Sequence, residues 1–380
     1  MKRRIVITLL TTALTVSLAA CGNKTAVAPA DNSSTDAVTV ADTATEEAPS
    51  SEEASEETKE PVALRAVAYN SIVAHLDSVI AKEAGYYEEE GLDVTMNYNN
   101  SNPDNIQALL EDKLDLVSAG STAVLNFIDQ GADIVIIGGQ MTEGVALYSL
   151  PERADEFKEI NEASLAGKKV GVTRMQTGDI ALRKILKDQG ADLSKIEFVE
   201  LDSPATIIEA VKKGEVDIGS LYMTFRETAE LQGLTPVCHL DELWPGYTCC
   251  RLFTTRDKLN ANRDAYVAAV KANIKAYSLI QQDREKTLEL AKHVMEIEDD
   301  VLTSQVYDYG HLGLNPSPDV KNITKFYEAM VEIGYAQGGI DFSEHVDASL
   351  YIEALDELLA EEPDNEVYKQ LKTESDQNNK

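Results

Sequence analysis

The chain has 380 residues and carries 66 acidic against 34 basic side chains, a formal net charge of −32 at pH 7. Nucleic-acid binding needs a basic surface, so this charge argues against a nucleic-acid partner. It also argues against long-range attraction of an anion by the protein surface as a whole, so an anion site would have to be local.

The first 21 residues have the layout of a secretory signal peptide. Residues 2–4 are basic, residues 5–16 are apolar apart from threonines, and the sequence Leu-Ala-Ala ends at Cys21. The apolar run is shorter than the about 20 residues that span a bilayer, and no later segment is longer. The end resembles a bacterial lipobox, which implies lipid on the Cys21 sulfur and a membrane-anchored extracytoplasmic protein. The alternative is an ordinary secretory peptide with a chance cysteine.

Residues 22–62 differ in composition from the rest of the chain. They are rich in Ala, Thr, Ser, Glu and Asp, and they contain no aromatic residue. Such a stretch cannot bury enough apolar surface to offset the entropy lost on ordering. We therefore expect a disordered acidic tether between membrane and folded part, in preference to an acidic interaction tail.

The following residues alternate between predicted strands and helices. The strands are predicted at 63–69, 91–97, 114–118 and 133–138, with helices at 74–90, 103–112 and 121–130. The pattern then restarts, with strands at 167–173, 196–201 and 216–221 and helices at 178–190 and 204–213. Apolar runs bounded by Gly and Asp, between amphipathic stretches, are typical of an α/β fold with parallel sheets.

This repetition predicts two lobes, each with a central sheet flanked by helices. Residues 246–254 are expected to return to the first lobe as a strand, and helices are predicted over 264–309, 322–333 and 348–359. The resulting boundaries are 63–147 for the first part of lobe 1, 148–246 for lobe 2, 247–360 for the rest of lobe 1 with the C-terminal helices, and 361–380 for a polar tail.

Four segments carry a resemblance to a known family. They are AKEAGYYEEEGLDV at 81–94, DLVSAGST at 115–122, SLAGKKVGV at 164–172 and AVKKGEVDIG at 210–219. In this order they resemble the nitrate/sulfonate/taurine and thiamine-pyrimidine-precursor solute-binding proteins, over roughly residues 64–340. The resemblance implies the type II periplasmic-binding-protein fold, two lobes that close on a solute by a hinge. It also implies a monomer without a cofactor, which delivers that solute to the permease and ATPase of an ABC importer.

The expected site lies beyond the carboxyl ends of the strands, where loops meet helix N-termini with free N–H donors. Loops 69–71, 120–122 and 173–178 fit this description, although Ser and Thr there could equally cap helices. The candidate ligand-binding residues are Tyr69, Asn70, Ser71, His75, Gly120, Ser121, Thr122, Thr173, Arg174, Gln176, Thr177, Gly178 and Tyr222.

The solute class stays open between two alternatives. A guanidinium at Arg174 could pair with a sulfonate or carboxylate, although a surface arginine would look the same. Tyr222 could stack on a pyrimidine-like ring, or it could pack within its lobe.

Three cysteines remain besides Cys21. Cys238 could bond to one of the adjacent Cys249 and Cys250, but burial as small apolar residues is the expectation. His239 beside Cys238 is too little for a metal site, so no metal is predicted.

The adjacent cysteine pair resembles part of the cysteine-rich patch of a fungal thiamine-pyrimidine synthase of the same fold. The longer cysteine run of that enzyme is absent here, and no histidine and nucleophile occur at a catalytic spacing. We therefore predict a binding protein and not an enzyme. Such an enzyme, or the sensory lobe of a signalling system, remains the alternative.

Overall fold

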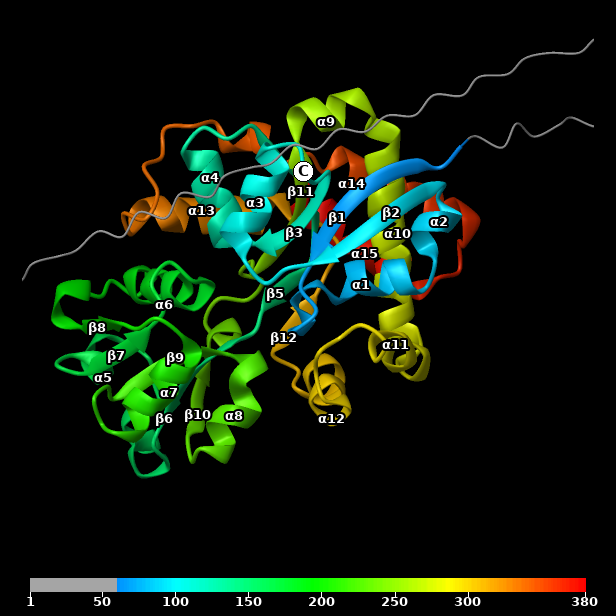
Figure 1. Ribbon diagram of the computed structural model, residues 1–380. Coiled ribbons are helices and arrows are strands. Elements are labelled where there is room, and N and C mark those ends of the chain that lie inside the picture. Colours follow the sequence, from blue (N-terminus) through cyan, green and yellow to red (C-terminus); the bar gives the residue numbers. More distant parts are fainter. Residues whose placement is uncertain (1–59) are drawn as a thin grey trace, which may run out of the picture. The chain divides into compact units, whose positions relative to one another are not determined.

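The computed structural model describes residues 60–380, which belong to one compact unit (Figure 1). The expected signal peptide, Cys21 and nearly all of the expected tether lie outside the described residues. Within residues 60–380, no helix combines the length and the apolar character needed to cross a membrane.

The first sheet is built from two separate stretches of the chain, 62–139 and 250–255. Its strand order is β2-β1-β3-β11-β4, with β1 parallel to β2 and β3, and β11 antiparallel to β3 and β4. The strands are β1 (Val62–Ala68), β2 (Leu92–Tyr98), β3 (Leu116–Gly120), β4 (Ile134–Gly139) and β11 (Cys250–Thr255). As predicted, the strand after residue 246 returns to the first sheet, where it fills the place between β3 and β4.

The second sheet repeats this plan with the order β10-β6-β9-β7-β8. Here β7 is parallel to β8 and β9, while β6 is antiparallel to β9 and β10. The strands are β6 (Val145–Ser149), β7 (Lys169–Val172), β8 (Glu197–Glu200), β9 (Ile218–Tyr222) and β10 (Thr235–His239). The prediction of two α/β lobes is confirmed, with one antiparallel addition to each parallel run. Because β6 begins at Val145, the second lobe starts three residues before the expected boundary at 148.

Two short strands lie where the chain passes from one sheet to the other. β5 (Met141–Glu143) connects β4 to β6, and it pairs in an antiparallel manner with β12 (Leu312–Leu314). We refer to β5 and β12 as the linking strands. Just before β12, Tyr309 packs in the apolar core of the second lobe, so β12 is tied to the same junction from the other side.

The helices around the first sheet form its apolar core. They are α1 (Leu76–Glu83), α2 (Tyr86–Glu89), α3 (Asn102–Leu110), α4 (Ser121–Asp129), α9 (Arg256–Ala261), α10 (Arg263–Gln282), α14 (Ser349–Glu361) and α15 (Glu366–Asn378). Helix α10 buries Tyr266, Val270 and Ile274, spaced along one face, against α1 and α14.

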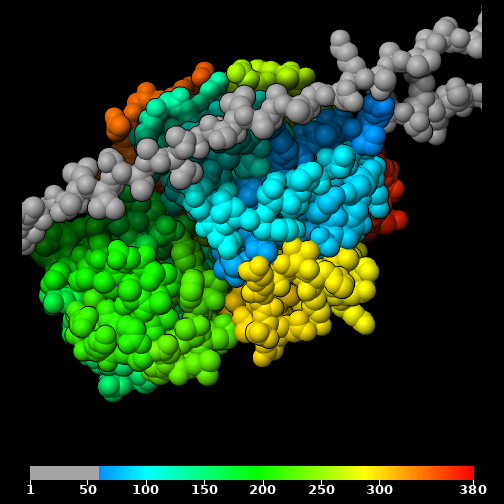
Figure 2. All heavy atoms as spheres, viewed as in Figure 1, coloured from blue at the N-terminus to red at the C-terminus, as the bar shows by residue number. Residues whose placement is uncertain are grey.

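The remaining helices are α5 (Glu162–Leu165), α6 (Thr177–Asp188), α7 (Pro204–Lys212), α8 (Arg226–Leu231), α11 (Arg284–Ala291), α12 (Asp299–Thr303) and α13 (Val320–Glu332). Short 3₁₀ turns lie at η1 (Val73–His75), η2 (Pro151–Phe157), η3 (Leu193–Lys195), η4 (Met223–Phe225), η5 (Leu240–Glu242) and η7 (Phe342–His345), and a π turn lies at η6 (Ser304–Asp308). Figure 2 shows the yellow residues of α11 and α12 against the blue residues that include α1, in agreement with the contact between α1 and α11.

The predicted helix over 74–90 is wrong as a single element. It divides into η1, α1 and α2, because Gly85 adopts the left-handed region with φ of 78° and ends the first helix. The predicted helical region 264–309 likewise divides into α10, α11 and α12.

The predicted polar tail at 361–380 is also wrong. Most of it is helix α15, whose first turn is capped by Asn365 through hydrogen bonds from the N–H groups of Val367 and Tyr368. Tyr368 and Leu371 are buried in the core around the first sheet. These two side chains, one turn apart, dock the helix together with hydrogen bonds such as that from Asn315 Nδ2 to Glu374 Oε2 at 3.0 Å.

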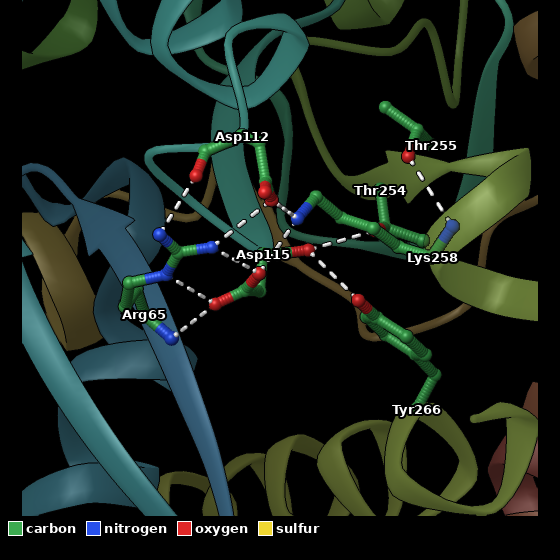
Figure 3. Close-up of polar contacts among 7 residues, drawn as sticks. All are labelled: Arg65, Asp112, Asp115, Thr254, Thr255, Lys258 and Tyr266. Atoms are coloured by element: carbon green, nitrogen blue, oxygen red, sulfur yellow. Dashed lines mark hydrogen bonds and ion pairs between the residues drawn. The ribbon is translucent and has the colours of Figure 1, made fainter. Parts of the chain in front are cut away.

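An ion-pair network holds the amino end of β3 (Figure 3). Asp115 accepts hydrogen bonds from Arg65 Nε at 2.7 Å, from the Arg65 backbone N–H at 2.9 Å, and from Lys258 Nζ at 2.8 Å. Burial alone would raise the pKa of Asp115, but the bonds to Arg65 and Lys258 outweigh it and hold this pKa below its ordinary value. The network therefore ties β1, β3 and α9 together.

Asp217 occupies the matching place directly before β9 in the second sheet. It accepts a hydrogen bond from the Lys169 backbone N–H at 2.6 Å and one from Arg153 Nη1 at 2.5 Å. Both sheets therefore use a helix, a tight turn and an aspartate that anchors the next strand to its neighbour.

Candidate functional site

A cavity of about 350 Å³ lies where the two sheets turn their carboxyl ends toward each other. Its volume falls in the range of roughly 300–1,000 Å³ that is usual for small-molecule sites. The residues that line it come from the ends of β1, β3, β7 and β9, from the first turn of α6, and from the start of β11. The predicted residues among them are Tyr69, Ser71, Gly120, Thr122, Thr173, Gln176, Thr177, Gly178 and Tyr222.

The wall from the first sheet is held by Asn102, which the sequence did not single out. Its Oδ1 accepts hydrogen bonds from the Tyr69 hydroxyl and, at 2.9 Å, from the backbone N–H of Gly120. Burial raises the pKa of Tyr69, so its phenol stays protonated at neutral pH. Asn102, the Tyr69 hydroxyl and the Gly120 N–H are therefore paired with one another before any ligand enters.

The wall from the second sheet is organised around the hydroxyl of Tyr222. This hydroxyl donates to Gln176 Oε1 at 3.0 Å and accepts from the backbone N–H of Thr177, the first residue of α6, at 3.3 Å. Gly178 lets the helix approach the sheet, because a Cβ there would lie 2.5 Å from Ser220 Oγ. A phenol, an amide and a helix N-terminus thus face the cavity together.

Cys249 and Cys250 line the cavity at the start of β11. Their Sγ atoms are 3.7 Å apart, and Thr177 Oγ1 lies 3.9 Å from Cys249 Sγ. Hydrogen bonding to Cys249, together with burial, raises the pKa of the Cys250 thiol. Cys238, Cys249 and Cys250 are all unbonded, so the pairing that the sequence left open is not formed.

The charged groups that line the cavity are acidic. Asp179 and Asp202 line it, whereas none of the lining residues, all within 60–380, is Arg, Lys or His. The Asp179 carboxylate sits in the first turn of α6 and accepts from Arg183 Nε at 2.6 Å and from the Tyr335 hydroxyl at 2.7 Å. A carboxylate in this position offsets the partial positive charge of the helix N-terminus.

Four predicted residues do not line the cavity. Asn70 turns its amide to the carbonyl of Val294 at 3.3 Å, and Ser121 is fully buried at the start of α4. His75 is also fully buried, where its Nδ1 accepts from the backbone N–H of Tyr69 at 3.0 Å. Burial lowers the pKa of His75 to about 3, so the ring is neutral and supports the wall from behind.

Arg174 is the fourth of these residues. Its guanidinium lies outside the cavity, 3.4 Å from Glu200 Oε1 and 5.2 Å from the ring centroid of Tyr335. The cationic anchor expected for a sulfonate is therefore a surface ion pair in this structure.

The sequence search also missed Phe225, Asp179 and the cysteine pair as lining residues. Phe225 follows the strand that ends at Tyr222, so a search three residues beyond the strand end would have included it. Asn102 offers no such signal, because it reaches the cavity from the start of a different helix.

Comparison with known proteins gives a family and a fold. The family model described as NMT1/THI5 like matches residues 73–287. Curated relatives from Brucella abortus and Brucella suis, described only as binding proteins, are 26% identical over 199 residues, which are 52% of this chain and 60% of theirs. The match thus spans 60% of the length of these relatives.

Solved structures resemble the described part across both lobes. The aliphatic sulphonate binding protein of Escherichia coli has a TM-score of 0.64 at 19% identity, covering 77% of this chain and 99% of that one. The nitrate-binding protein of Synechocystis has a TM-score of 0.64 at 15% identity, covering 79% and 89%. The ligand-binding component of an ABC-type import system from Staphylococcus aureus, solved with zinc bound, has a TM-score of 0.62 at 19% identity, covering 77% and 99%. At these identities the likeness shows the periplasmic-binding-protein fold.

Proposed function

The chain belongs to the NMT1/THI5-like family, and from that premise we propose that it captures a small solute outside the cytoplasm and delivers it to an ABC importer. Three observations support this role. The fold is the two-lobed one of solute-binding proteins, a cavity of suitable size lies between the two sheets, and the N-terminus resembles a lipoprotein signal ending at Cys21. Lipid on Cys21 would keep the protein beside its permease.

In the proposed mechanism the solute contacts both walls of the cavity at once. Only contacts made to both lobes favour the closed form over the open one, because a ligand shifts an equilibrium by its difference in affinity for the two states. Tyr69 and Thr122 supply the first wall, while Gln176 and Tyr222 supply the second. Docking on the permease then opens the lobes and releases the solute.

The solute that we propose is a neutral, planar heterocycle such as a pyrimidine precursor. The observation that carries this choice is the charge of the lining, which contains two aspartates and no basic residue. A sulfonate or nitrate would lose its hydration without a cationic partner, and an unpaired buried charge is costly. Tyr69, Tyr222 and Phe225 offer ring faces, and Gln176 offers an amide for hydrogen bonds to ring nitrogens.

The test is a thermal-shift screen of the purified protein, followed by calorimetric titration of any hit. Heterocycles in the panel are hydroxymethylpyrimidine, formylaminopyrimidine and riboflavin, and anions are taurine, alkanesulfonates and nitrate. A ligand that binds only the folded protein stabilises it by RT ln(1 + [L]/Kd). We expect a heterocycle to raise Tm. A rise with anions alone would overturn the choice of solute, and no rise with any of them would count against the binding role itself.

Variants of Tyr222 connect the hit to the cavity. Tyr222→Phe removes the hydroxyl that bonds Gln176 and Thr177, which should weaken binding about tenfold. Tyr222→Ala also removes the ring and should weaken binding by about another tenfold. Tyr307→Phe is the matched control, because its hydroxyl donates to the Ile280 carbonyl, away from the cavity. Equal affinity of the Tyr222→Ala variant and the unchanged protein would place the ligand elsewhere.

A further inference from the structure

Three metal-ligand side chains converge at the junction of the two lobes, outside the cavity. His239 ends β10, Asp241 lies in η5 two residues later, and His311 directly precedes the linking strand β12. One ligand atom from each side chain lies within 4.8 Å of the others. The two imidazole rings stack in parallel with centroids 3.6 Å apart, and His311 Nδ1 lies 2.8 Å from Asp241 Oδ2. None of the three lines the cavity.

Two atoms of this cluster have no hydrogen-bond partner although they are buried. They are His239 Nδ1 and Asp241 Oδ1. Leaving a buried donor or acceptor unpaired costs free energy, and the cost is larger for a charged group. The hydrogen bond between His311 and Asp241 satisfies only one oxygen of the carboxylate, so an internal ion pair does not account for the whole arrangement. A cation between the side chains would satisfy both free atoms.

The ligand set narrows the kind of cation. Two imidazoles and one carboxylate match the ligands of zinc and similar first-row ions, whereas calcium and magnesium prefer oxygen ligands. With bonds of about 2.1 Å, the ligand atoms of a tetrahedral zinc site lie roughly 3.4 Å apart. The three ligand atoms lie within 4.8 Å of one another, so zinc binding requires the side chains, and the stacked rings above all, to turn toward a common centre.

The surroundings of the cluster also favour a cation. Glu143 and Glu242 lie within electrostatic reach of it and add negative charge to that of Asp241. Arg226 opposes them, but its guanidinium is paired with Glu230 at 2.8 Å and lies over the Tyr309 ring.

We infer that His239, Asp241 and His311 form a binding site for a first-row divalent transition-metal ion, with zinc as the best match. Three protein ligands leave a fourth position for water. The ion joins the second sheet to the linking strands, because β12 pairs with β5 and the His311 carbonyl accepts from Gly144 N–H at 3.0 Å. The site therefore strengthens the junction about which the lobes are arranged.

The experiment uses the full chain, stripped with a chelator and desalted, and titrated with zinc chloride in a calorimeter. We expect one zinc ion per chain with micromolar or tighter affinity, and a higher Tm in its presence. Cobalt(II) serves as the spectroscopic probe, because tetrahedral nitrogen and oxygen ligation intensifies its visible absorption. Absence of a saturable zinc site in the unchanged protein would overturn the inference.

Variants assign the ligands. His239→Ala, His311→Ala and Asp241→Asn should each weaken zinc binding by more than the about 10–100-fold that changes beyond the ligands usually cost. His293→Ala and Cys238→Ser are the controls, because His293 is exposed and Cys238 adjoins the site without belonging to the cluster. The metal-free Tm of every variant is measured, so that misfolding is not mistaken for loss of a ligand. Equal zinc affinity of His239→Ala, His311→Ala and the unchanged protein would overturn the site.

Discussion

The two walls of the cavity are built on the same arrangement of helix, turn and strand, but the contacts beyond the strand differ. In each sheet a helix, a turn and an aspartate lead into the strand, with Asp115 before β3 and Asp217 before β9. Beyond the first of these strands, Asn102 pairs with Gly120 and Tyr69, so that wall is closed on itself. Beyond the second, the Tyr222 hydroxyl connects the strand to the start of α6, because it donates to Gln176 and accepts from the Thr177 N–H.

This comparison separates the two ends of the strands β3 and β9. The amino end is built in the same way in both sheets, whereas the contacts at the carboxyl end differ. At the amino ends of β3 and β9, an aspartate pairs with the neighbouring strand in both sheets. This pairing belongs to the structural framework. At the carboxyl ends, each wall combines a phenol with an amide, Tyr69 with Asn102 in the first wall and Tyr222 with Gln176 in the second. Recognition in open α/β sheets resides at the carboxyl ends. The three predictions below test this division.

The largest expected effect concerns His75, which supports the first wall. Its pKa is lowered to about 3 from an ordinary 6.5, so the folded protein resists protonation that the unfolded chain accepts. The stability that this provides is present above pH 6.5 and is lost as pH falls toward 3. In His75→Asn, the loss of unfolding free energy between pH 7 and pH 4 should be smaller by about 3 kcal/mol.

Urea unfolding at pH 7, 5.5 and 4 measures this difference. Asp77, whose pKa burial raises to about 8, changes stability in the opposite direction, but it does so in both proteins. His293→Asn is the control, because His293 is exposed and its replacement should leave the pH profile unchanged. Parallel profiles for His75→Asn and the unchanged protein would contradict the role of a neutral buried ring.

The second prediction compares the two aspartates directly. Asp115→Ala leaves Arg65 and Lys258 with the exposed carboxylate of Asp112 and should cost about 2–3 kcal/mol of unfolding free energy. Asp217→Ala should cost about 1–2 kcal/mol, because Asp217 has fewer partners. The contribution of Asp115 is present above its ordinary pKa and is lost as pH falls below about 4, since its folded-state pKa is lowered.

Chemical denaturation at pH 7 and pH 3 separates these cases. Asp93→Ala is the control, because that exposed aspartate lies on β2 and its replacement should stay within about 0.5 kcal/mol. If Asp115→Ala and Asp93→Ala gave the same unfolding free energy, the network in Figure 3 would not be part of the scaffold.

The smallest expected effect is that of Arg174, at the rim of the second wall. Its ion pair with Glu200 is exposed, so Arg174→Ala should change stability by no more than about 0.5–1 kcal/mol and leave the affinity for a heterocycle unchanged. Calorimetric titration of this variant checks the affinity. A large loss of binding would show that the guanidinium turns into the cavity when the lobes close. An anionic solute would then be the better candidate.

Much of the fold could be predicted because its signals are local. The alternation of apolar runs with amphipathic stretches located most of the strands of both sheets, and the loops after three strands contained most of the predicted cavity residues. The failures were local as well. The prediction of one helix over 74–90 did not allow for Gly85. The prediction of a polar tail at 361–380 rested on average polarity and disregarded Tyr368 and Leu371.

The sequence alone determined that this protein has two α/β lobes and that its site lies at strand ends. The signals were the alternation of apolar runs with amphipathic stretches and the residue types of the turns. These features depend on residues within a few positions of one another, where backbone geometry imposes a period. Only the tertiary structure decided which side chains meet. Asn102 reaches the first wall from another helix, Arg174 passes outside the rim, and His311 joins His239 from more than 70 residues along the chain. Such long-range contacts depend on how whole helices and strands pack, and no local sequence pattern predicts that packing.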